Sequence, residues 1–224
     1  GDVSGGNKGN GDLLLLKIDA SGNLLWSRTY GSSQSDVAFS IANTSDHGFI
    51  IFGCTNGSDG AVPFHYGDFF SLDWLLIKTD STGNIQWSKD LGGTGNESPG
   101  CVLSIGNDCY LISSTNSRDH DCTDTAWHSG VSDLSPYYVL KLDNSGNVLW
   151  SKSYGGRYCN AYGAIYDDRD NSIVITGRLD GGGYMATGGH GSEDIWVIKI
   201  DTNGSLIWQQ VWCSPYDDEG ESIC

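Results

Sequence analysis

The stretch KIDASGNLLW at residues 17–26 recurs three more times, as KTDSTGNIQW at 78–87, KLDNSGNVLW at 141–150 and KIDTNGSLIW at 199–208. Lysine and tryptophan stand nine positions apart in every copy, and successive copies begin 61, 63 and 58 residues after one another. A near-constant period of this size predicts a repeat architecture.

The segment between two copies predicts four short strands. In the unit from Val37 to Leu91, apolar and β-branched residues gather at 37–42, 49–54, 73–79 and 85–89. A turn of the Asp-x-x-Gly type joins the last two runs, and a long polar loop covers 55–72. Four-stranded units of this length are typical of β-propeller blades.

We therefore expect an all-β protein, a β-propeller of four-stranded antiparallel blades with about four repeats. The expected units are 1–36 (partial), 37–99, 100–162 and 163–219, and 220–224 starts a blade split between the termini. Residues 1–224 form a single domain or part of a larger propeller in this interpretation. A gapped four-bladed ring, a piece of a longer propeller and a ring completed by a second chain all fit, and exposed strand edges would favour self-association.

The amino-acid composition limits the classes of partner that the chain is expected to bind. The 28 acidic residues outnumber the 12 basic ones, which gives a net charge of −16. Because phosphate groups are bound through lysine and arginine, this charge argues against nucleic acid. No apolar run approaches the roughly 20 residues of a membrane span, so no membrane insertion is expected.

Seven cysteines lie outside the shared repeat pattern, and none forms a C-x-x-C pair. That scatter predicts one to three disulfides in an oxidising compartment and at least one free thiol. Cys224 is the natural candidate for the free thiol.

The units resemble the β-propeller repeats of secreted and cell-surface proteins from Bacteroidetes-type bacteria. Those repeats read as DxWVVKLDxxGNIxW, and DIWVIKID at 194–201, DWLLIKTD at 73–80 and GDVSG at 1–5 match pieces of the pattern. The resemblance covers the whole chain and implies an extracellular or cell-surface location. It implies little about activity, because that family is a scaffold attached to many functions.

The loops between second and third strands are the expected place for function, because a rigid scaffold presents variable loops on one side. We predict that ligand contacts come from Asp59, His65, Tyr66, Asp119, Asp121, Trp127, His128, Tyr184 and His190. Three carboxylates in six residues, Asp119, Asp121 and Asp124, are the candidate ligands for calcium, although the glycine and distal glutamate of an EF-hand are missing.

These observations favour a binding or scaffold module that recognises a glycan or an extracellular protein through its loops. The first alternative is a structural subunit of a surface filament or adhesin that assembles through open blade edges. The second is a glycan-active enzyme with acids on the loop face. No G-x-S-x-G, H-E-x-x-H or P-loop motif is present, so no catalytic residue is assigned and an enzyme is the less favoured reading.

Overall fold

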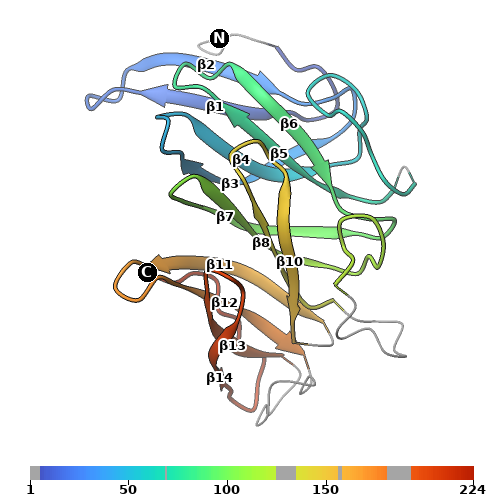
Figure 1. Cartoon of the computed structure of the whole chain (residues 1–224). Helices are drawn as coiled ribbons and strands as arrows, with labels where there is room; N and C mark the ends of the chain where they lie inside the picture. The colour runs from blue at the N-terminus through green and yellow to red at the C-terminus, as the bar shows by residue number, and fades with distance from the viewer. Residues whose placement is uncertain (1–5, 69, 125–134, 156–157, 181–192) are drawn as a thin grey trace.

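The computed structural model describes residues 6–68, 70–124, 135–155, 158–180 and 193–224. Within them the chain is all-β, with a two-stranded sheet and three four-stranded sheets (Figure 1). The half-blade contains β1 (Leu13–Ile18) and β2 (Leu24–Tyr30). Blade 1 contains β3 (Asp36–Asn43), β4 (Phe49–Thr55), β5 (Asp73–Thr79) and β6 (Ile85–Leu91). Blade 2 contains β7 (Glu97–Ile105), β8 (Asp108–Thr115), β9 (Tyr137–Leu142) and β10 (Val148–Tyr154), and blade 3 contains β11 (Cys159–Asp167), β12 (Ser172–Asp180), β13 (Glu193–Asp201) and β14 (Leu206–Trp212).

The predicted fold class is confirmed. Every neighbouring strand pair within a sheet is antiparallel, and each complete blade keeps its strands in chain order. The sheets follow one another in chain order in Figure 1, and the first strands β3, β7 and β11 contact one another in succession. Among the described residues, no helix has the length and apolarity that a transmembrane helix requires.

Residues 213–224 contain no strand, so the strand start predicted at 220–224 is not formed. The Asp218 N–H donates to the Glu193 carbonyl at 2.9 Å, as the Glu97 N–H donates to the Leu72 carbonyl at 2.9 Å in blade 2. The segment therefore makes the hydrogen bond with which a first strand begins, but it does not pair with a neighbouring strand.

The repeated aspartate shapes the hairpin that joins the third and fourth strands. Asp80 Oδ1 accepts hydrogen bonds from the N–H groups of Thr82 (2.8 Å) and Asn84 (2.9 Å), and the corresponding bonds recur at Asp19, Asp143 and Asp201. The glycine of each copy has a positive φ of 76° to 84°, a conformation that glycine adopts without strain. These contacts explain why the sequence pattern recurs.

The repeated tryptophan joins neighbouring blades. A Cβ placed on Gly146 would lie 3.1 Å from the ring of Trp87, and the same approach joins Gly83 to Trp26 and Gly204 to Trp150. Each ring thus packs on the hairpin of the next blade, where only glycine leaves room.

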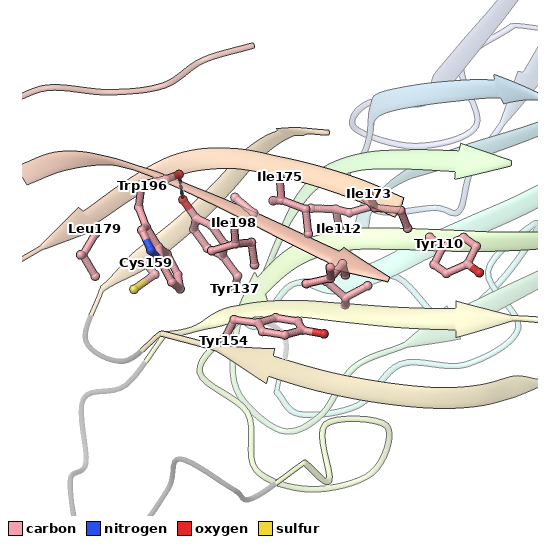
Figure 2. Close-up of a cluster of buried hydrophobic side chains, with 13 residues drawn as sticks. Tyr110, Ile112, Tyr137, Tyr154, Cys159, Ile173, Ile175, Leu179, Trp196 and Ile198 are labelled. Atoms are coloured by element: carbon pink, nitrogen blue, oxygen red, sulfur yellow. Dashed lines mark hydrogen bonds between the residues drawn. The ribbon is translucent and has the colours of Figure 1, made fainter. Parts of the chain in front are cut away.

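Apolar clusters fill the spaces between sheets. Figure 2 shows the cluster between blades 2 and 3, in which the Tyr137 ring lies 4.6 Å from the Trp196 ring and its hydroxyl donates to the Trp196 carbonyl at 3.1 Å. All seven cysteines are free thiols, so the predicted disulfides are not formed. Four of them, Cys54, Cys109, Cys122 and Cys159, are instead buried in blade packing.

Candidate functional site

Each blade has two ends with different chemistry. The hairpin end carries the turns at 44–48 and 80–84 in blade 1, and the loop end carries the long connection 56–72 and the link to the next blade. At the loop end, the boundary between blades 1 and 2 gathers acidic side chains from separate strands. We call the set His65, Asp73, Asp90, Glu97 and Asp121 the acidic junction.

The strands place the acids of this junction side by side. Asp73 is the first residue of β5, Asp90 lies near the end of β6, and Glu97 is the first residue of β7. All three are buried. Asp73 Oδ2 accepts the Tyr66 N–H at 2.5 Å, and Glu97 Oε1 accepts the Thr115 hydroxyl at 2.7 Å.

The remaining carboxyl oxygens, Asp73 Oδ1, Glu97 Oε2 and both oxygens of Asp90, are buried and receive no N–H donor. The three acids lie against one another instead, with Asp73 at hydrogen-bonding distance from Asp90 and Glu97 when a proton is shared. Burial raises the pKa of all three carboxyl groups, and the charge of Asp73 raises the pKa of Asp90 further. Burial and mutual repulsion therefore favour the protonated forms of these carboxyl groups unless a cation compensates their charge.

His65 closes one side of the junction. Its Nδ1 lies 3.0 Å from Asp73 Oδ2, but no hydrogen bond of normal geometry joins the two. Its Nε2 lies 3.0 Å from the carbonyl oxygen of Asp68. The nearest ligand-type atoms of His65, Asp73 and Asp90 all lie within 4.8 Å of one another.

An aromatic patch of Phe64, Tyr66 and His120 lies beside the acids and spans the two blades. The Tyr66 and His120 rings stack at 4.2 Å with an interplanar angle of 28°, and the Phe64 ring meets Tyr66 edge-on at 4.5 Å. Phe64 is 51% exposed and His120 is also exposed, so the patch is open to solvent.

The structure thus brings together three of the predicted ligand residues, His65, Tyr66 and Asp121. Burial raises the pKa of Asp121, whose Oδ2 accepts the Gly92 N–H at 3.3 Å. Asp59 instead accepts the Ser33 N–H at 2.6 Å and shapes its own loop. The other predicted residues, Trp127, His128, Tyr184 and His190, lie outside the described residues.

The three candidate calcium ligands have separate partners. Asp119 accepts the N–H and the hydroxyl of Thr94, both at 2.8 Å, and these bonds lower its pKa. Asp124 accepts the Ser153 N–H at 2.6 Å. Among the described residues, His65, Asp73 and Asp90 place three ligand-type atoms within 4.8 Å of one another, and calcium binding by Asp119, Asp121 and Asp124 stays a prediction.

Sequence reasoning missed Asp73, Asp90 and Glu97. The available signal was Asp90, an acid at a position where Thr29 and Ser153 stand in the neighbouring units. Asp73 and Glu97 gave no such signal, because the half-blade and blade 1 carry Asp12 and Asp36 at the corresponding positions. Only the packing of blade 1 against blade 2 shows that these three acids lie close together.

No protein-family model matches the chain. It is 31% identical over 108 residues to the regulatory protein FlaEY of Caulobacter vibrioides, a match that covers 46% of this chain and 11% of that protein.

Two solved structures are similar at 12% identity, and each match covers 89% of this chain. One is the subtype N10 neuraminidase-like protein of A/little yellow-shouldered bat/Guatemala/060/2010, with a TM-score of 0.47 over 50% of its length. The other is the subtype N11 neuraminidase-like protein of A/flat-faced bat/Peru/033/2010, with a TM-score of 0.36 over 58% of its length. The fold assignment accordingly rests on the blades themselves.

Proposed function

We propose that this chain is a recognition module of an extracellular or cell-surface β-propeller, of the kind found in the Bacteroidetes-type repeat proteins that its sequence resembles. It binds a glycan or a protein partner at the loop end of the boundary between blades 1 and 2. The observation that carries the proposal is the aromatic patch, an open ring surface built from two blades beside buried acids.

The chemistry of the patch suits a sugar. An aromatic ring offers a large apolar face that can stack on the apolar face of a pyranose, while polar groups at its rim bind hydroxyls. The Phe64 ring is exposed, and the Asp68 carboxylate and Asn96 amide accept hydrogen bonds from Phe70 and Leu72 of the same loop. The net charge of −16 favours a neutral or cationic ligand over an anionic one.

A glycan array tests this proposal, with the folded chain, the Phe64→Ala and Tyr66→Ala variants, and Tyr216→Ala as a matched control. Tyr216 is 81% exposed in the segment after blade 3. The expected result is a specific hit that both patch variants lose and the control keeps. A blank from the folded chain, or hits that both patch variants retain, contradicts glycan recognition at this patch. Adding and removing calcium in the same screen tests the calcium prediction.

A second candidate function, assembly through an open blade edge, is favoured by the half-blade. Leu14 and Leu16 of β1 are each 47% exposed, whereas Leu75 and Ile77 at the same positions of β5 are fully buried. A groove of about 350 Å³ lies between β1 and β3. An unpaired edge with apolar side chains is a template for another strand, so two copies can pair β1 against β1.

Sedimentation velocity over a range of concentrations tests assembly. The wild-type chain should form dimers that the Leu14→Lys and Leu16→Lys variants do not form. Ile207→Lys, at a 52% exposed position of β14, is the matched control and should dimerise normally. A wild-type chain that stays monomeric at all concentrations contradicts this candidate.

A further inference from the structure

The acidic junction buries three carboxyl groups against one another. Asp73 is 0% exposed, Glu97 is 1% exposed and Asp90 is 8% exposed, yet four of their carboxyl oxygens, Asp73 Oδ1, Glu97 Oε2 and both oxygens of Asp90, are buried with no N–H donor. Lys78, Lys141, Arg169, Arg178 and Lys199 form ion pairs with other acids, and His65 Nδ1 lies 3.0 Å from Asp73 Oδ2 within the junction. Because unpartnered buried carboxyl oxygens are costly, such a cluster requires shared protons or a bound cation.

The histidine of the junction directs one ring nitrogen toward the acids. A carbonyl oxygen can only accept, so the contact of 3.0 Å to Asp68 assigns a proton to His65 Nε2. In the neutral ring the lone pair of Nδ1 then faces Asp73 Oδ2 at 3.0 Å, where a cation would join the two acceptors, and in the protonated ring the same contact is an ion pair. Histidines that bind metals donate their other ring N–H to a carbonyl or carboxylate in this way.

We propose that the acidic junction binds one divalent transition-metal ion, of the zinc or manganese class, through His65 Nδ1 and the carboxylates of Asp73 and Asp90. The ligand-type atoms lie within 4.8 Å of one another, and small side-chain shifts bring them to the roughly 2.0–2.2 Å bonds that such ions make. Glu97 adds a further carboxyl oxygen beside them. An imidazole ligand selects this class over calcium, which takes oxygen ligands.

The neighbouring junctions support the assignment, because they share the fold but not the ligands. The boundary between blades 2 and 3 has Pro136, Ser153 and Cys159 where the acidic junction has Asp73, Asp90 and Glu97. The boundary between the half-blade and blade 1 keeps Asp12 and Asp36 but has Thr29 at the position of Asp90. The complete ligand set therefore occurs at one described junction.

Calorimetric titration of the metal-stripped chain with Zn²⁺, Mn²⁺ and Ca²⁺ tests the proposal. We expect saturable binding of one Zn²⁺ or Mn²⁺ ion per chain. Asp90→Ser, which copies the residue of blade 2, and His65→Gln should each weaken it by at least about 100-fold, since even outer-shell changes cost about 10- to 100-fold. Asp119→Ser removes an acid of the same loop end that bonds to Thr94, and it should bind metal normally.

Circular dichroism of each variant establishes that it is folded before titration. A folded wild-type chain that binds neither Zn²⁺ nor Mn²⁺ overturns the proposal and leaves shared protons as the compensation. Binding that survives both Asp90→Ser and His65→Gln also overturns it, as does binding of Ca²⁺ alone that Asp119→Ser abolishes. None of these readouts depends on the glycan or protein partner.

Discussion

The acidic residues at the two ends of the blades differ in their interaction partners. At the hairpin end, the repeated lysine meets an aspartate in every complete blade: Lys78 with Asp46 at 2.7 Å, Lys141 with Asp108 at 3.0 Å and Lys199 with Asp170 at 2.6 Å. At the loop end between blades 1 and 2, Asp73, Asp90 and Glu97 lie buried together, and the nearest basic group is His65. The hairpin acids are paired with lysines, whereas the three junction acids lie buried against one another.

This difference shows how to find a site in a repeat protein rich in acids. With 28 acidic and 12 basic residues, the count of carboxylates alone says little. The hairpin acids recur in every unit and have partners, so their role is explained. The junction acids combine Asp73, Asp90 and Glu97 at one described boundary, and burying them together destabilises the fold unless shared protons or a bound cation compensate their charge.

Copying the acids into another junction should have the largest effect on the free energy of unfolding. Ser153→Asp combined with Cys159→Glu copies the acids of the junction between blades 1 and 2 into the boundary between blades 2 and 3. Both positions are buried, and Asp124 already bonds to Ser153. We expect a loss of about 3–5 kcal/mol in the free energy of unfolding, measured by urea denaturation.

The control for this transplant is Ser58→Asp with Thr123→Glu, which adds the same charge at exposed loop positions. It should change the free energy of unfolding by less than about 0.5 kcal/mol. Equal losses in the two double variants would mean that overall charge, and not burial at a junction, sets the cost.

Removing an acid from the acidic junction should change the free energy of unfolding by less, and it should raise this free energy instead of lowering it. In a chelator, Asp90→Ser should raise the free energy of unfolding by about 1 kcal/mol, because it deletes a buried carboxyl group that lies against the like-charged groups of Asp73 and Glu97. Adding Zn²⁺ should stabilise the wild-type chain and leave the variant unchanged. A variant less stable than the wild-type chain in chelator would show that Asp90 is already compensated within the protein.

A substitution at the hairpin end should have the smallest effect on the free energy of unfolding, and this effect should depend on pH. A hydrogen bond from Lys78 is the main reason that the pKa of Asp46 falls to about 2. A lowered pKa contributes stability above the ordinary aspartate pKa of about 3.9, and this contribution is lost as the pH falls through about 2. Because Asp46 is 38% exposed, Asp46→Asn should cost no more than about 1 kcal/mol near pH 7.

Urea denaturation of both chains from about pH 7 to about pH 2 measures this contribution. The difference between the wild-type chain and Asp46→Asn should shrink as Asp46 takes up a proton. A difference that stays constant over this range would assign the effect of the substitution to geometry and not to charge.

The sequence predicted much of the fold because the repeated residues make local contacts. The aspartate bonds within its own turn, and the glycine and tryptophan of successive copies meet at a fixed interval, so the period alone indicates blades. The predicted disulfides failed because cysteine spacing does not report distance in space. Cys122, for example, lies against Thr115 and Glu97 instead of another cysteine.

The candidate site was only partly predictable for the same reason. Asp119 stood out as part of an acidic run, but it repeats the role of Asp59: each accepts an N–H from the link that precedes its own blade. Asp73, Asp90 and Glu97 are separated in the sequence by strands and a loop, and they become a cluster only when two blades pack. A search for acids at positions that are neutral in sister repeats would have found Asp90.

The most direct test of the acidic junction is anomalous diffraction from crystals of the chain soaked in Zn²⁺. We predict one strong peak between His65 Nδ1 and the carboxylates of Asp73 and Asp90, and no peak at the boundary of Pro136, Ser153 and Cys159. No peak at His65 in well-ordered crystals with excess Zn²⁺, or a peak at Asp119 instead, would contradict the account.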